Sequence, residues 1–323
     1  MRIKWGWKKS RYAYGLSLSD QEAKLVEIRP SDSRVAVTRR FSAPLPDGCM
    51  REGRIADAQA AAEALRTMVK DADLRGTGVN VAVPLSSVAL RKAAFPSVKD
   101  RELRHLIDVD LHGGTPLPFQ NPVFDFIRLG PAAEAGKDEV LIFATPRDVV
   151  EELVRTVRSA GLEPVAVDLV PLALLRLLAR HAAITGEEAP DRFMLLYVEA
   201  ERVDVSIFAD SVPVLFRSFR SSRNIWLEQG GDPLALFGRS LSIELSRLMN
   251  YYRYSMSSDH GEIRRIYMAF DNAEVKRLPE FLDESLRELI RPLPMERVLY
   301  LFFENIAEYD PYAVAIGLAL KGA

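Results

Sequence analysis

Cysteine is almost missing from this sequence, because Cys49 is the single cysteine among 323 residues. One thiol excludes a disulfide framework and a cysteine-based zinc site, and it is typical of a protein kept in a reducing cytoplasm. Histidine is also scarce. The four histidines lack the i, i+4 spacing that places two ligands on one helical face, so we expect no metal site. They are His105, His112, His181 and His260.

Long apolar runs and a strong charge of one sign are lacking as well. No segment approaches the ~18 consecutive apolar residues of a transmembrane helix, and the basic N-terminus has no apolar core of a signal peptide. Lys and Arg number 43 against 45 Asp and Glu, a formal net charge of −2, which argues against nucleic acid as a partner. Hydrophobic residues at 48% and charged residues at 27% match a globular protein. We expect a cytoplasmic protein of about two domains.

The N-terminus carries tryptophans and cations without an acidic residue, including Trp5, Trp7, Lys8 and Lys9. Tryptophan favours the bilayer interface, and clustered cations favour anionic lipid. These four residues are therefore candidates for contact with a membrane surface. The simpler alternative is a solvated chain end that precedes the first strand.

Strand and helix patterns occur twice in the same order, which predicts an α/β fold built from two related lobes. Each half has two strands around a polar turn, a third strand, a helix and a further strand. In the first half the strands are expected at 12–18, 23–28, 35–41 and 79–83, with the helix near 57–73. In the second half they are expected at 193–198, 203–208, 212–219 and 263–270, with the helix near 236–256.

A separate block interrupts the first half. It is predicted to contain strands at 89–95, 123–129 and 140–144 and helices at 99–111 and 147–160, the second ending at Gly161. A polar linker, 185–190, separates the halves. We therefore divide the chain into a first lobe of 1–85 plus 164–188, an insert of 86–163, and a second lobe of 189–323 with a reduced helical region around 222–262.

Seven segments, by their order and spacing, resemble the family of PilM-type pilus assembly proteins. They are Gly15 to Ser19, Lys24 to Glu27, Leu45 to Gly48, Gly53 to Ile55, Leu103 to Phe119, Ala160 to Val165 and Ala313 to Leu320. The resemblance implies an actin-like fold: duplicated RNase H-like lobes, with a small α/β insert in the first lobe like that of the cell-division protein FtsA.

The same resemblance implies a function in type IV pilus or competence pseudopilus assembly. Such proteins are cytoplasmic scaffolds at the inner face of the membrane. They bind the N-terminal cytoplasmic peptide of a bitopic membrane protein, PilN, between the first lobe and its insert, and meet the motor platform; self-association is a further possibility. Aromatic, proline and arginine side chains anchor peptides well, which makes Arg91, Phe95, Pro96, Phe119 and Phe124 candidates for the groove. The alternative is that each belongs to the core of the insert.

The nucleotide turns expected from the family are altered here. Family members bind ATP and Mg²⁺ with Asp-Ile-Gly at two turns and Gly-Gly at a third. This chain has Ser17-Leu18-Ser19, Tyr197-Val198-Glu199 and Phe270-Asp271 instead. Glycine permits close approach of backbone to phosphate. A negative charge ~4 Å from a phosphate charge costs about 4 kcal/mol at an effective dielectric of ~20.

We therefore predict a pseudo-ATPase with no catalytic residue, no metal and no cofactor. Three alternatives remain open. Asp20 and Asp204 lie near the turns and would supply carboxylates in a shifted register. An intact site would make the protein an ATP-binding switch of the same machinery. A sugar-kinase-like enzyme on this fold is the third alternative, and the missing aspartates weigh against it.

Overall fold

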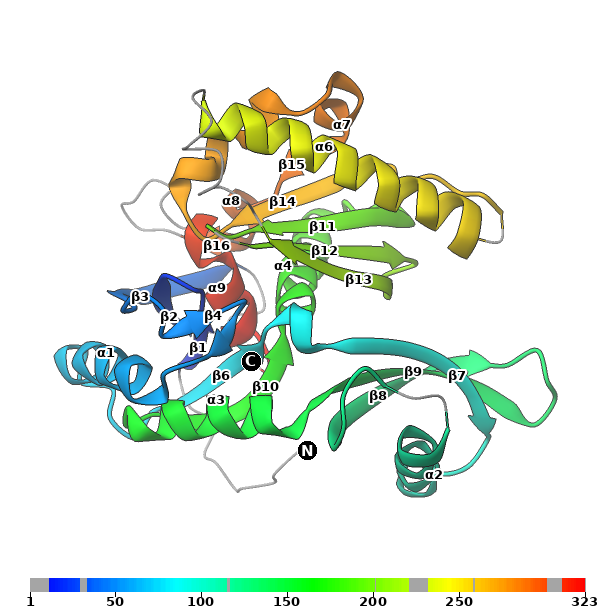
Figure 1. Cartoon of the computed structure of the whole chain (residues 1–323), viewed down its shortest axis with the longest axis horizontal. Helices are drawn as coiled ribbons and strands as arrows, with labels where there is room; N and C mark the ends of the chain where they lie inside the picture. Colours follow the sequence, from blue (N-terminus) through cyan, green and yellow to red (C-terminus); the bar gives the residue numbers. More distant parts are fainter. Residues whose placement is uncertain are drawn as a thin grey trace.

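A computed structural model describes residues 12–29, 34–114, 117–200, 202–220, 232–257, 259–300 and 310–322. Its layers alternate between helices and sheets (Figure 1). A six-stranded sheet and a five-stranded sheet each have one face toward a shared pair of helices, and each has its other face covered by helices of its own.

The six-stranded sheet belongs to the first lobe and has the order β10-β6-β1-β2-β3-β16. The β1–β2 and β2–β3 pairs are antiparallel, whereas β6 pairs in parallel with β1 and β10. A β4–β5 hairpin lies between β3 and α1. The bounds are β1 Ala13–Leu18, β2 Glu22–Arg29, β3 Val35–Pro44, β4 Met50–Arg51, β5 Arg54–Ile55, α1 Ala58–Asp71, β6 Gly78–Val83, β10 Glu163–Leu169 and β16 Leu299–Tyr300.

The five-stranded sheet of the second lobe repeats this topology in the order β13-β12-β11-β14-β15. Its β11–β12 and β12–β13 pairs are antiparallel, and β14 pairs in parallel with β11. The duplication expected from the sequence is therefore confirmed. The bounds are β11 Arg192–Val198, β12 Arg202–Ala209, β13 Val212–Arg220, α6 Pro233–Tyr251, β14 Ile266–Phe270, α7 Glu284–Leu289 and β15 Ile290–Pro292. A π-helical turn, Tyr252–Met256, continues α6, and a 3-10 segment, Ala273–Phe281, follows β14.

The insert is a three-stranded antiparallel sheet of order β7-β9-β8 with one helix on it (Figure 1). Apolar side chains from its strands and from α2 form a small core of their own, since Leu103, Ile107 and Ile142 are fully buried between them. The bounds are β7 Ala89–Pro96, α2 Asp100–Gly113, β8 Pro122–Pro131 and β9 Lys137–Pro146, and a 3-10 turn, Leu85–Ser87, leads into β7.

Two helices lie between the sheets, namely α4 (Val170–Thr185) and α9 (Ala313–Ala319). Their apolar side chains share one core with β2 and β3 of the first lobe and with β11 and β14 of the second. Backbones approach closely here, because a Cβ on Gly15 of β1 would lie 2.0 Å from the carbonyl oxygen of Ala315. A Cβ on Gly317 would lie 2.2 Å from the carbonyl oxygen of Ala173. Only glycine fits either position.

The lobe boundaries differ from those expected at two places. The end of the chain returns to the first lobe, because β16 pairs with β3 and α9 packs on β1. The helix α3 (Arg147–Ser159), placed in the insert by the sequence, packs on α1 of the first lobe through Val149, Leu153 and Val157. Apolar spacing shows that a helix has a buried face, but it does not tell which element covers that face.

Candidate functional site

Three turns at the carboxyl ends of strands meet between the two lobes. They follow β1, β11 and β14, and cross-lobe contacts join them. The Lys24 Nζ on β2 donates to the backbone oxygen of Asp271 at 2.6 Å, although the two residues are 247 positions apart. Ser19 of the first turn lies close enough to the Asp271 carboxylate to lower its pKa, against the larger effect of burial. Within the second lobe, the Asp271 backbone N–H donates to the Val198 oxygen at 3.2 Å. The three turns that the sequence singled out are therefore one site.

Arg202 lies at the centre of this site. It begins β12, and its side chain is only 4% exposed. Its Nη2 lies 2.5 Å from Glu199 Oε2, and its Nε lies 3.4 Å from Asp204 Oδ1. Asp20 of the first turn accepts a hydrogen bond of 2.8 Å from the Gly53 backbone N–H, beside the Arg202 guanidinium. The candidate carboxylates Asp20 and Asp204 are thus both engaged by groups of this chain.

Burial controls the electrostatics of these turns. It raises the pKa of Glu199 well above its usual range, against the attraction of Arg202. The carboxyls of Asp204 and Asp271 have raised pKa values for the same first cause. Burial opposes the charge on Arg202, but Glu199 and Asp204 outweigh it and raise the pKa of the guanidinium. Buried acids therefore outnumber the buried cations at these turns.

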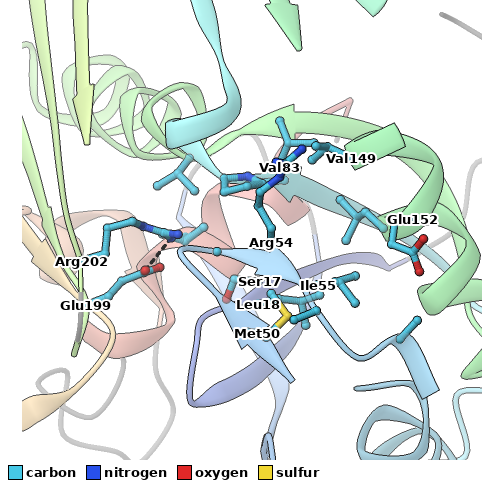
Figure 2. A pocket seen from close by; sticks show the side chains of 18 of the residues that line it. Ser17, Leu18, Met50, Arg54, Ile55, Val83, Val149, Glu152, Glu199 and Arg202 are labelled. Carbon is cyan, nitrogen blue, oxygen red and sulfur yellow. Dashed lines mark ion pairs between the residues drawn. The ribbon is translucent and has the colours of Figure 1, made fainter. Parts of the chain in front are cut away.

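A cavity of about 480 Å³ opens beside the turns (Figure 2). The Arg202–Glu199 pair lies on one side, and Val149 and Glu152 of α3 lie on the other; the β4–β5 hairpin contributes Arg54 and Ile55 between them. Most of the lining residues are apolar, although polar atoms supply the larger share of the exposed surface. The cavity is lined by Ser17, Leu18, Met50, Gly53, Arg54, Ile55, Ala56, Ala58, Ala82, Val83, Pro84, Asp148, Val149, Glu152, Leu153, Val170, Tyr197, Glu199, Arg202 and Val314.

The six turn residues named from the sequence divide into two sets. Ser17, Tyr197 and Glu199 line the cavity. Ser19, Phe270 and Asp271 are buried beside it, each with at most 5% of its surface exposed. Burial raises the pKa of Tyr197 well above its usual value, with Glu199 next in effect. Sequence reasoning missed Arg202, because a single arginine in a turn ordinarily points into solvent.

The five groove candidates lie on the insert rather than around the cavity. Phe95 and Phe124 pack with α2 in the core of the insert, and Arg91 pairs with Asp110 of α2 at 3.0 Å. Pro96 is exposed at the end of β7, and Phe119 is half-buried before β8.

Trp5, Trp7, Lys8 and Lys9 lie outside the described residues. Within the ranges that the structure describes, no three His, Cys, Asp or Glu residues form a metal cluster, and no helix has the length and apolarity to cross a bilayer.

The two facing lobes, with their duplicated sheets and turns, define an actin-like fold with a small α/β insert in the first lobe. A family model described as "Type IV pilus assembly protein PilM" matches residues 15–220. The chain belongs to this PilM family, and its resemblance to that family is confirmed.

Solved structures agree with this assignment. The chain is similar to one in a structure entitled "PilM-PilN type IV pilus biogenesis complex", with 25% identity and a TM-score of 0.78 over 98% of this chain and 99% of that one. The ethanolamine utilization protein EutJ from Carboxydothermus hydrogenoformans shares the fold, with 11% identity and a TM-score of 0.55 over 97% and 90% of the chains. No curated protein matches the sequence.

Proposed function

We propose that this protein is a non-catalytic scaffold of a type IV pilus or competence pseudopilus machine. It binds the N-terminal cytoplasmic peptide of a PilN-like bitopic membrane protein in the cavity that α3 and the β4–β5 hairpin of the first lobe form with Arg202 and Glu199 of the second lobe. The observation that carries this proposal is the position of the cavity, between the β4–β5 hairpin and α3. The solved complex of a PilM with a PilN supports a partner of this kind.

The lining suits a peptide better than a charged metabolite. Apolar residues such as Ile55, Val83 and Leu153 are the majority of its lining residues, but polar atoms supply the larger share of its exposed surface, and charged groups of both signs are among them. Arg54 lies 3.6 Å from Asp148 beside the cavity, and both side chains are largely exposed. Pockets that take an organic ligand are mainly apolar, with a few placed polar groups. The cavity therefore accommodates one or two apolar side chains of a peptide whose backbone finds polar partners nearby.

The test is a calorimetric titration with a synthetic peptide of the N-terminal cytoplasmic residues of the PilN-like protein from the same organism. Ala56 is exposed and lines the cavity, so Ala56→Trp blocks the space with little effect on the core. We expect the wild type to bind and this variant to lose at least about tenfold in affinity, about 1.4 kcal/mol. The matched control is Ala133→Trp, at an exposed position in the insert outside the lining. Absence of binding to the wild type at high micromolar peptide contradicts the proposal.

We also infer that nucleotide has no place between the turns. Tyr197 and Glu199 stand where the family has small residues and glycine, and buried Arg202 and Lys24 already pair with the groups around them. A sugar kinase needs the same nucleotide as its phosphate donor, so the absence of nucleotide binding also excludes this activity.

Thermal unfolding with millimolar Mg-ATP tests this second inference. We expect the melting temperature to match that measured with MgCl₂ alone. A nucleotide present at 100 times its Kd would stabilise the protein by about 2.7 kcal/mol, which such a melt detects easily. A clear rise with ATP would instead support the ATP-binding switch.

Binding to the tail of a bitopic protein would hold the scaffold at the inner face of the membrane. Contact with the motor platform and self-association remain predictions. The test is the amount of this protein found in the membrane fraction of cells with and without the PilN-like protein. A loss from membranes without the PilN-like protein supports this route, whereas unchanged binding supports direct attachment through Trp5 and Trp7.

A further inference from the structure

Two buried basic side chains, one from each lobe, extend to the opposite lobe. Lys24 extends from β2 of the first lobe to the backbone oxygen of Asp271 in the second, and its side chain is 5% exposed. Arg202 extends from β12 of the second lobe to the β4–β5 turn of the first, where its guanidinium lies against Gly53. The lobes are therefore joined by charged side chains next to the cavity, in addition to the apolar core around α4 and α9.

The contact at Gly53 is unusually close. This residue has φ +77°, and a Cβ placed on it would lie 1.8 Å from Arg202 Nη1 and 2.6 Å from Pro84 Cβ. Its N–H bonds Asp20, so the turn is fixed from its other side as well. The next two residues, Arg54 and Ile55, are walls of the cavity. The guanidinium thus sets the position of the turn that shapes the proposed peptide site.

Arg202 also retains unused hydrogen-bonding capacity. Nη1 is buried and makes no hydrogen bond to the residues that the structure describes, whereas Nε faces Asp204 Oδ1 at 3.4 Å. A buried donor without an acceptor costs free energy, and an acceptor brought by a ligand recovers it. Since Arg202 lines the cavity, a backbone carbonyl of a bound peptide is such an acceptor. An apolar residue of equal size at this position would join the lobes without offering this donor.

We propose that Arg202 is a positioning residue for the partner cavity and makes peptide binding depend on closure of the two lobes. The identity of the ligand rests on the proposed function, whereas the role of Arg202 in lobe closure does not. In this arrangement the guanidinium holds the β4–β5 turn against the second lobe, and a peptide in the cavity strengthens the same contact. Partner binding and lobe closure then favour each other, as linkage requires.

Two glycine substitutions isolate the contact. Gly53→Ala places a methyl group against Arg202, whereas Gly48→Ala has the same φ of +77° with nothing within 4 Å of the added Cβ. Both variants carry similar backbone strain, so only the first displaces the guanidinium. Arg202→Lys is a second way to break the contact. It keeps a cation beside Glu199 and Asp204, which protects the fold if Gly53→Ala proves unstable.

The first measurement needs no peptide. Spin labels at Thr67→Cys on α1 and Asn250→Cys on α6, both exposed positions, report the distance between the lobes in a Cys49→Ala background. We expect Gly53→Ala and Arg202→Lys to shift or broaden this distance distribution, and Gly48→Ala to leave it unchanged. An unchanged distribution in both contact variants overturns the inference.

The second measurement is the peptide titration described above. We expect the affinity of Gly53→Ala and Arg202→Lys to fall about tenfold, within the usual range of coupling between sites, and that of Gly48→Ala to stay near the wild type. A changed distance with unchanged affinity overturns the coupling. If the wild type binds no peptide, the proposed function fails, and the distance measurement still decides whether Arg202 closes the lobes.

Discussion

Replacing Gly15 with alanine is expected to lower the free energy of unfolding by about 3 kcal/mol, at the upper end of the usual cost of overpacking a core. The new Cβ would lie 2.0 Å from the Ala315 oxygen, 2.6 Å from the Ala319 nitrogen and 2.9 Å from the Leu318 Cβ. Two of these three atoms are backbone, so no side-chain rotation relieves the collision. The helix α9 must move away from β1. Urea unfolding followed by circular dichroism measures the loss.

The control for this variant is Gly113→Ala at the end of α2, where an added Cβ meets nothing within 4 Å. Its stability should remain close to that of the wild type. Gly317→Ala is expected to cost a similar amount to Gly15→Ala, because it forces the same helix from Ala173. The two collisions share α9, so the cost of the double variant is not expected to be the simple sum of the two. A wild-type denaturation midpoint for Gly15→Ala would show that α9 does not pack on β1 as described.

Stability is expected to fall as the pH rises above the ordinary carboxyl pKa of about 4. Burial raises the pKa values of Glu199, Asp204 and Asp271 in the folded protein. The folded state consequently binds more protons than the unfolded state above the ordinary carboxyl pKa of about 4. Stability from these groups is complete below that value and is lost as the pH rises through their folded-state pKa values. Each full proton of difference contributes about 1.4 kcal/mol per pH unit.

Glu199→Gln tests the assignment of this pH dependence. Glutamine keeps the size of the side chain and removes its titration, while Asp204 still pairs with Arg202. We expect a shallower loss of stability between pH 5 and 8, measured by chemical unfolding at each pH. Glu188→Gln, an exposed position, should keep the wild-type slope. Equal slopes for Glu199→Gln and the wild type would mean that Glu199 does not titrate in this range.

The sequence predicts the repeated elements well, because alternation in strands and helical spacing are local signals. The strand expected at 263–270 begins only at Ile266, since Arg264 and Arg265 separate Ile263 from the apolar run that forms the strand. The helix α4 is not among the predicted elements. Its residues are apolar on several sides, which removes the periodic signal. Pairing of β16 with β3 depends on contacts across more than 250 positions, which no local pattern encodes.

The candidate site, like the fold, is predicted only in part from the sequence. Ser17, Tyr197 and Glu199 follow from the places where the family has its nucleotide turns, and the structure brings these turns together. Arg202 does not follow, because its role depends on Gly53, a residue about 150 positions away that faces it across the lobes. A signal did exist in retrospect. An arginine three residues after an acid in a turn between buried strands is the spacing of an ion pair, and Glu199 and Arg202 have it.

The packing of α9 on β1 has a consequence for folding during synthesis of the chain. The Gly15 and Ala315 backbones that touch are 300 positions apart, so a ribosome adding 5–20 residues per second needs about 15–60 s to make the second after the first. During that interval the face of β1 that packs against α9 is not covered by this helix. A nascent chain of this protein therefore exposes apolar residues of β1 until α9 has been synthesised.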